Sequence, residues 1–221
     1  MKKQEAAHAY YPVLLNVLGK KCLVVGGGMI ALRKAQTLIE HGAEVVVVSP
    51  TIVAELQEMT KGGLVKAIPR EYQTKDLNDA FLVIAATNGI RVNERVADEA
   101  KKRKILVNVV DKPDISDFIV PAYFRHGDII VAVSTSGKSP ALARKIRSEI
   151  KNELRAEYSQ LAVIASDVRS ELKKNGTPVS PEEWQSALEL NSLIELIRRG
   201  KNKEAKEIML AKLSPPTKRK S

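Results

Sequence analysis

Short apolar runs alternate with stretches of helical periodicity along the first half of the chain. The runs at 22–25, 45–48, 64–68, 81–86 and 105–109 are rich in β-branched and other apolar residues and predict five strands. Between them, apolar residues mostly recur at every third or fourth position, which predicts helices. Because strands and helices alternate, we expect an α/β fold with a parallel, doubly wound, Rossmann-like sheet.

The helix after the fourth strand has the clearest apolar stripe of this half. Val92, Val96, Ala97 and Ala100 follow helical spacing, so we expect them to face the sheet.

The pattern changes beyond Pro113. Strand-like runs at 118–121 and 129–133 are separated by a short polar link at 125–128, which predicts antiparallel pairing. We expect this small β-unit to be attached to the sheet edge. Its exposed apolar face would suit contact with a second copy of the chain.

The last third of the chain has helical spacing throughout. An apolar stripe predicts one continuous helix from Arg144 to about Gly176. A capping box that begins at Ser180 predicts a second helix, which ends at Gly200, and a last short helix is expected to reach Leu213. Within the second helix, Trp184 is expected to be a core residue.

Three consecutive glycines separate the first strand from the first helix. Gly26 would allow a tight turn, and Gly28 would let the backbone approach a pyrophosphate closely, while the first N–H groups of the helix face the phosphate charge. The alternative is a tight turn that binds nothing. The run 45–48 completes a β-α-β unit of the required length, so the context favours dinucleotide binding.

In sheets of this kind ligands bind beyond the carboxyl ends of the strands. The second strand ends at Ser49, where dinucleotide-binding folds commonly carry Asp or Glu for the ribose. The hydroxyl groups of Ser49 or Thr51, or backbone groups, would therefore hold a ribose more weakly. No Arg or Lys follows immediately, so NAD is favoured over NADP. The strand-end candidates are Gly26 to Ile30, Ser49-Pro50-Thr51, Thr87-Asn88 and Val110-Asp111.

Asp111 has two interpretations. The segment Asp-Lys-Pro-Asp is rich in turn formers, so Asp111 is accounted for as a turn residue. It also follows the fifth strand directly, where a carboxylate would point into the ligand crevice. Local sequence leaves both interpretations open.

The loop from Ser134 to Ser139 precedes a helix that is expected to begin with Ser139 as N-cap and Pro140 at its first position. A phosphate-binding Walker motif is excluded, because Ala132 stands where its first glycine is needed. Hydroxyl groups, backbone amides and Lys138 would still suit a carboxylate or phosphate. The alternative is a well-capped helix start with serines facing solvent.

Composition narrows the class of partner. The net charge of +10 suits either nucleic acid or a polyanionic small molecule, and the aromatic content of 4% favours the small molecule. A single cysteine and three histidines make a transition-metal site improbable. The sequence has no apolar run of about 20 residues and no signal-peptide pattern at its start, so we expect a cytoplasmic protein without membrane contact.

Several motifs in the same order resemble those of the precorrin-2 dehydrogenases of sirohaem synthesis. That family includes stand-alone bacterial enzymes, a bifunctional yeast enzyme and the N-terminal part of fused sirohaem synthases. The resemblance covers residues 10 to 150, and the helical end is a looser match. The motifs are Tyr11-Pro12, Gly26 to Lys34, Ala85 to Asn88, Asn108 to Asp111, Phe118 to Pro121 and Val133 to Arg144.

This resemblance implies oxidation of precorrin-2 to sirohydrochlorin, an NAD-dependent step of tetrapyrrole (porphyrin) biosynthesis, in a homodimer built on the small β-unit. Asp111 corresponds to the essential aspartate of the family and would act as general base. The family's cofactor contacts fall on Met29-Ile30, Pro50-Thr51 and Thr87-Asn88. The carboxylate-rich substrate gives Ser134, Thr135 and Lys138 a binding role.

Two alternatives stay open. Some relatives also insert Fe²⁺ into sirohydrochlorin, and from a different class the chain could be a non-catalytic NAD-sensing regulatory module. A carboxylate at Asp111 favours the enzyme, because a sensor does not need one facing the nicotinamide. The expected parts are a NAD-binding domain (1–113), a dimerisation and substrate-site region (114–150) and a helical C-terminal domain (151–221).

Overall fold

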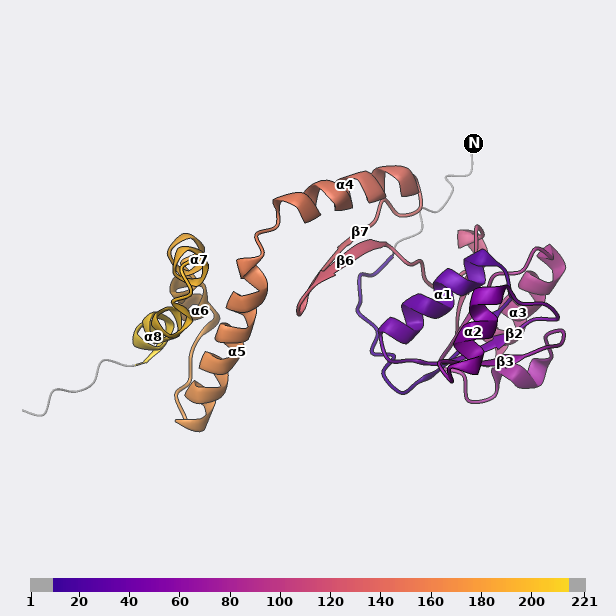
Figure 1. The fold of residues 1–221 in the computed structure, drawn as a ribbon, viewed down its shortest axis with the longest axis horizontal. Helices are drawn as coiled ribbons and strands as arrows, with labels where there is room; N and C mark the ends of the chain where they lie inside the picture. Colours follow the sequence, from indigo (N-terminus) through magenta and orange to yellow (C-terminus); the bar gives the residue numbers. More distant parts are fainter. Residues whose placement is uncertain (1–9, 215–221) are drawn as a thin grey trace, which may run out of the picture. The chain divides into compact units, whose positions relative to one another are not determined.

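The computed structural model describes residues 10–214 (Figure 1). The chain divides into two compact units between Val120 and Pro121. Each unit is described by itself. The division into three parts at 113 and 150 stays a prediction.

The first unit is built on a five-stranded parallel sheet with the strand order β3-β2-β1-β4-β5. The strand order reverses between β1 and β4, which places a topological switch point at their carboxyl ends. The expected Rossmann-like sheet is therefore confirmed. Its elements are β1 (Lys21–Val25), α1 (Met29–Glu40), β2 (Glu44–Val48), α2 (Ala54–Lys61), β3 (Val65–Ile68), the 3₁₀ turn η1 (Thr74–Leu77), β4 (Leu82–Ala85), α3 (Ile90–Lys102), β5 (Leu106–Val109) and the 3₁₀ turn η2 (Pro113–Ile115).

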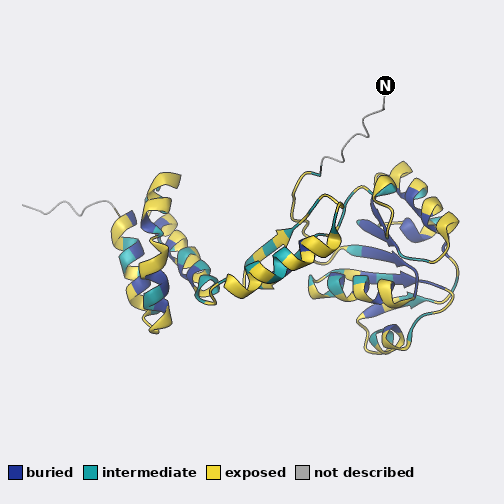
Figure 2. Ribbon diagram, turned by 90° about the horizontal axis from the view of Figure 1, so that it is seen from above, coloured by how far each residue is buried: buried dark blue, intermediate teal, exposed yellow. Residues whose placement is uncertain are grey.

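Each face of this sheet has its own apolar core. Cys22 and Val24 of β1 pack with α1 and α2 on one face, whereas Leu23 and Val25 pack with α3 on the other. Successive side chains of a strand point to opposite faces, so a run that is apolar throughout serves both cores. Figure 2 shows the buried strands between helices whose outer sides are exposed.

One predicted core position of α3 is wrong. Val92 is 40% exposed, and Asn93 is buried in its place at 8% exposed. A polar residue takes the inward position because its side chain forms hydrogen bonds with the loop after β4.

The second unit begins with a hairpin whose first strand differs from the prediction. The strand is β6 (Ala122–His126), not 118–121, and it pairs with β7 (Ile129–Val133) through a turn at Gly127-Asp128. Gly127 has a φ of 58°, which permits this tight turn. Residues 116–118 instead lie along β5, where Asp117 N–H donates to Val107 O at 2.8 Å. The hairpin forms a two-stranded sheet of its own, with no strand pairing to the larger sheet, and its attachment to the edge of that sheet stays a prediction.

The predicted long helix from Arg144 is two helices, α4 (Pro140–Glu153) and α5 (Glu157–Lys174). Leu154 separates them with an extended backbone, at a ψ of 117°. The two helices have different main partners: α4 lies on both strands of the hairpin, whereas α5 packs mainly on α7 and α8 and touches only β7 of the hairpin. The segment between the two helices contains no Gly or Pro, so we attribute the break to packing.

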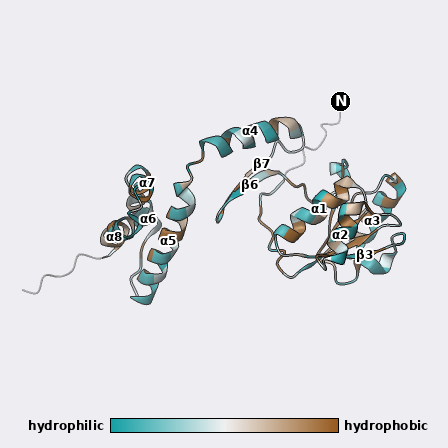
Figure 3. Cartoon of the chain, in the orientation of Figure 1, coloured by the Kyte–Doolittle hydropathy of each residue, from teal (hydrophilic) through white to brown (hydrophobic). Residues whose placement is uncertain are grey.

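The second predicted helix is also divided, into α6 (Pro181–Ala187) and α7 (Leu190–Arg198), and α8 (Asn202–Leu213) follows. The capping box at Ser180 is confirmed, since Ser180 Oγ accepts from Glu183 N–H at 3.2 Å and Glu183 accepts from Ser180 N–H at 2.7 Å. Helices α5 to α8 share an apolar core that includes Leu161, Val168 and Met209. Most of α4 is hydrophilic by comparison (Figure 3).

Candidate active site

The glycine turn after β1 is shaped by close backbone approach. Gly26 has a φ of 126°, and a Cβ there would collide with Ala86 O at the end of β4. A Cβ at Gly27 would collide with Thr51 O in the loop after β2. The sequence alone gives Gly27 no role, because the requirement for glycine there comes from the neighbouring loop.

Gly28 differs from its two neighbours. A Cβ there would project into space free of other described atoms within 4 Å. Gly28 is the N-cap residue of α1, and Leu32 N–H donates to its carbonyl oxygen at 2.9 Å. The uncharged residues Met29, Ile30 and Ala31 form the first turn of α1. This helix start leaves its first N–H groups available to an anion.

The loop after β2 is tied to the glycine turn. Val53 N–H donates to Gly27 O at 2.9 Å, which holds the loop next to the start of α1. Ser49 is 8% exposed, and its hydroxyl donates to Thr51 O at 2.6 Å. Pro50 and Thr51 are exposed. Ser49 thus has a structural hydrogen bond, and its contact with a ribose stays a prediction.

The loop after β4 depends on Asn93 of α3. Asn93 Oδ1 accepts from the Thr87 N–H at 3.2 Å and from the Thr87 hydroxyl at 2.7 Å. Asn93 Nδ2 donates to Thr87 O at 2.9 Å, and Asn88 beside it is exposed. Asn93 was missed by the sequence analysis. The signal that could have identified it is helical spacing, because Asn93 lies on the same face of the helix as Val96, Ala97 and Ala100.

Asp111 follows β5 in a left-handed conformation with a φ of 60°. It lines a cavity of about 160 Å³ together with Thr87 and Asn93, so the carboxyl ends of β4 and β5 share one small cavity. Glu94 and Lys112 also contribute to this cavity. Of the predicted site residues, the structure brings Thr87 and Asp111 together here.

Lys34 of α1 is a further charged group of this region that the sequence analysis missed. Burial lowers the pKa of the Lys34 ammonium and neighbouring Arg33 lowers it further, whereas the negative charge of Asp111 opposes both. Asp111 therefore acts electrostatically on a residue of the helix that begins at the glycine turn. The carboxylate and the glycine turn belong to one edge of the sheet.

Ser134, Thr135 and Lys138 belong to the second unit, in the loop between β7 and α4. Ser134 Oγ accepts from Ser136 N–H at 3.0 Å, and Thr135 Oγ1 accepts from Ser139 N–H at 2.9 Å. Ser139 caps α4 by accepting from Leu142 N–H at 3.2 Å, as expected. Lys138 is exposed. Binding of substrate by this loop stays a prediction.

Within residues 10–214, no helix has the length and apolar content needed to cross a bilayer.

Comparison with known proteins gives concordant matches. A family model described as putative NAD(P)-binding matches residues 13–122, and a model described as sirohaem biosynthesis protein, central, matches residues 127–153. Siroheme synthases from Nitrosococcus oceani and Stutzerimonas stutzeri are each 37% identical to the chain over 92% and 93% of its length. The chain spans 44% of the length of each of these relatives.

A solved structure supports the same relationship. The structure of SirC, a precorrin-2 dehydrogenase, superposes with a TM-score of 0.66 at 27% sequence identity. The match covers 92% of this chain and 98% of SirC, and therefore includes the helical end as well as the sheet. The chain belongs to the family that contains the siroheme synthases and the precorrin-2 dehydrogenase SirC.

Proposed function

We propose that the chain catalyses the NAD-dependent oxidation of precorrin-2 to sirohydrochlorin. The observation that carries this proposal is the cavity that Asp111 and Thr87 share at the carboxyl ends of β5 and β4. A carboxylate in that position suits proton transfer beside a bound dinucleotide. The match to SirC over nearly its whole length supports the same reaction.

The glycine turn fits a dinucleotide. Space is open at Gly28, and the uncharged first turn of α1 presents N–H groups to which a pyrophosphate would bind. Met29 and Ile30 are 62% and 41% exposed at that helix start. We propose that they contact the cofactor together with Ser49, Pro50 and Thr51 of the neighbouring loop and with Thr87 and Asn88. When bound, NAD supplies the hydride acceptor of the reaction.

Asp111 would remove the proton. Oxidation takes two electrons and two protons from precorrin-2, as one hydride and one proton, so the enzyme needs a base for the proton. The Asp111 carboxylate is the proposed base, because it lines the cavity next to Thr87. The turn that carries it is closed by Lys112 N–H, which donates to Val109 O at 3.2 Å.

The substrate carries many carboxylates and needs cations and N–H groups to hold them. We propose that the loop with Ser134, Thr135 and Lys138 supplies some of these contacts. The hydrogen bonds of Ser134 and Thr135 to backbone N–H groups give this loop a defined shape.

We also propose that the protein is a homodimer. In the hairpin, Arg125 pairs with Ile130, and Ile130 is 38% exposed on the sheet face opposite buried Phe124. Ala132 is exposed on the same face, and exposed apolar residues on a two-stranded sheet suit contact with a second copy. The variant Ile130→Lys is expected to sediment as a monomer. The cytoplasmic location stays a prediction.

The reaction tests the proposal directly. Purified protein with precorrin-2 and NAD is expected to form NADH and the absorption spectrum of sirohydrochlorin. A parallel sample with Fe²⁺ tests the second activity, since formation of sirohaem would show that the enzyme is bifunctional. Binding of NAD without any oxidation of precorrin-2 would contradict the enzyme and favour a sensor.

A further inference from the structure

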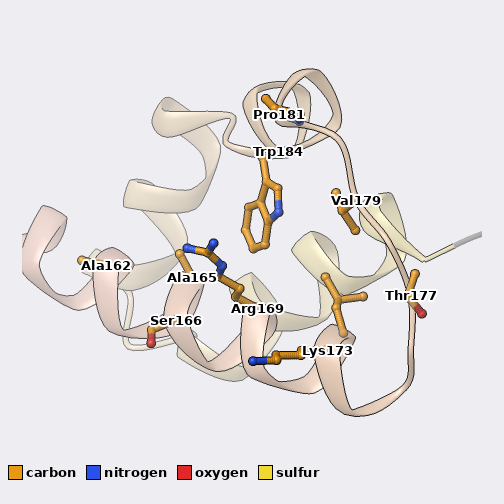
Figure 4. Close-up of a pocket in the computed structure, with 10 residues that line it drawn as sticks. Ala162, Ala165, Ser166, Arg169, Lys173, Thr177, Val179, Pro181 and Trp184 are labelled. Carbon is orange, nitrogen blue, oxygen red and sulfur yellow. The ribbon is translucent and has the colours of Figure 1, made fainter.

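The helical part of the second unit contains a groove of about 670 Å³ between α5, the segment after it and α6 (Figure 4). Sites for small organic ligands have volumes of roughly 300–1,000 Å³. The groove lies in the helical region that the sequence motifs described least well, and the reaction proposed above assigns it no role.

An indole forms the centre of the groove. Trp184 projects from α6 toward α5, with Arg169 on one side and Val179 on the other (Figure 4). Trp184 packs against the helical core and is half-buried, so the prediction of a core residue holds for part of the ring. Leu172, which is 3% exposed, adds to the apolar wall. The groove therefore offers a flat apolar surface for a flat apolar ligand.

Two cations stand at this apolar surface. Arg169 and Lys173 are four residues apart, on one face of α5, and both are exposed. Within residues 10–214, neither has an ion pair or a side-chain hydrogen bond. On the same helix, by contrast, Glu171 pairs with Lys206 at 2.8 Å.

The lining has one sign of charge. None of the described residues that line the groove is acidic, and Ser166 and Thr177 add hydroxyl groups. Positive charge without a partner beside an apolar wall favours a ligand that combines carboxylates with a flat ring system.

We propose that this groove binds an acidic tetrapyrrole, separately from the Asp111 cavity. Carboxylates at the edge of the macrocycle would pair with Arg169 and Lys173, while its flat face stacks on Trp184. The class of ligand rests on the proposed function, because the substrate and product of that reaction have this chemistry. Such a site would keep product or substrate on the enzyme before or after the reaction.

The test is the number of sirohydrochlorin molecules bound per chain, measured by equilibrium dialysis in the presence of NAD. The wild-type chain is expected to bind two. The double variant Arg169→Gln/Lys173→Gln is expected to bind one, because loss of two charge-assisted contacts lowers the affinity of the groove for sirohydrochlorin by about 100-fold. Trp184→Phe is expected to weaken this second site by about tenfold.

The matched control is Lys174→Gln/Lys203→Gln. It removes the same charge from exposed positions of α5 and α8 outside the groove and is expected to keep both sites. Equal stoichiometry in wild type and the groove variant would overturn the proposal. A change in self-association of the groove variant, with unchanged stoichiometry, would make the groove an interface between copies and also overturn it.

Activity separates this proposal from the proposed function. The groove variant is expected to form NADH from precorrin-2 at the wild-type rate constant kcat, and its unfolding midpoint is expected to match wild type. Failure of the wild-type chain to oxidise precorrin-2 would reject the dehydrogenase, whereas the bound stoichiometry of sirohydrochlorin reports on the groove.

Discussion

Asn93 of α3 holds Thr87 at the end of β4 through three hydrogen bonds, to its N–H, its hydroxyl and its carbonyl oxygen. Thr87 lines the same cavity as Asp111. A buried amide thus fixes the backbone on one side of the proposed catalytic carboxylate.

Replacing Asn93 by Ala is expected to lower the free energy of unfolding by about 1–3 kcal/mol, because it leaves the N–H and carbonyl of Thr87 without their partner. NAD binding is expected to weaken as well, since the loop after β4 loses its anchor. Urea unfolding and NAD titration measure the two effects. Val92→Ala is the control, because Val92 is 40% exposed, and a loss equal to that of Asn93→Ala would contradict the proposed anchor.

Gly27 and Gly28 are expected to respond differently to the same substitution. Gly27→Ala places a Cβ against Thr51 O and is expected to cost roughly 3 kcal/mol of stability. Gly28→Ala meets open space, so its unfolding midpoint is expected to stay near wild type while NAD binding falls by about tenfold or more. Thermal unfolding and NAD titration of both variants separate the structural glycine from the cofactor-binding one. Equal stability of the two variants would disprove this distinction.

Asp111→Asn is expected to keep NAD binding and to lose oxidation of precorrin-2 by at least about 100-fold, because the amide cannot accept the proton. Asn tolerates the φ of 60° at this position, so it removes the charge with less strain than Ala would cause. Single-turnover formation of NADH is the measurement. Unchanged NADH formation in this variant would contradict the assignment of Asp111 as general base.

Asp76 provides a pH-dependent contribution to stability. Burial raises its pKa, but hydrogen bonds from Arg70 and the Gln73 N–H, with the charge of Arg70, hold the pKa below its ordinary value of 3.8. Arg70 contacts both carboxylate oxygens, at 2.8 and 2.6 Å. A lowered folded-state pKa gives stability above the unfolded pKa that is lost as pH falls through the folded value.

Asp76→Asn is therefore expected to lower the free energy of unfolding by about 2–3 kcal/mol at pH 7. Below about pH 4, this free energy is expected to change less with pH in the variant than in wild type. Urea unfolding from pH 7 to pH 3 measures both quantities. Glu58→Gln is the control, because the exposed ion pair of Glu58 with Lys61 on α2 contributes little to the free energy of unfolding. Parallel pH curves for Asp76→Asn and wild type would contradict the linkage.

Cys22 is expected to be inert in the folded protein. It is 0% exposed in β1, and burial raises the pKa of its thiol to about 11. A thiol reagent at pH 8 is expected to modify it at the rate of global unfolding and to react at once in urea. Rapid modification without denaturant would show that β1 opens locally.

Much of the first unit was predictable because its signals are local. Apolar runs such as 45–48 end within a residue or two of the observed strands, and the glycines mark the turn before α1. Capping residues Ser139 and Ser180 marked two helix starts correctly, since a cap needs only its own next turn. The position of Asp111 at the site edge of the sheet was predictable because the carboxyl ends of parallel strands meet there, whereas its role as a base stays a prediction.

The sequence-based predictions were wrong where residues far apart in the chain determine the local structure. Asn93 faces inward because Thr87 needs its amide, the chain breaks at Leu154 because α4 and α5 have different main partners, and Phe118 lies beside β5 instead of in the hairpin. The requirement for Gly27 depends on Thr51, 24 positions later.

By itself, the sequence determined the parallel sheet, the glycine turn and the position of Asp111, because apolar periodicity and turn chemistry act over a few residues. The tertiary structure alone decided that Thr87 and Asp111 share a cavity, that Asn93 anchors it, and that Trp184 lines a groove with Arg169 and Lys173. Those contacts join residues that are far apart in the sequence, so no local pattern predicts them. They form only when whole helices and strands pack against one another.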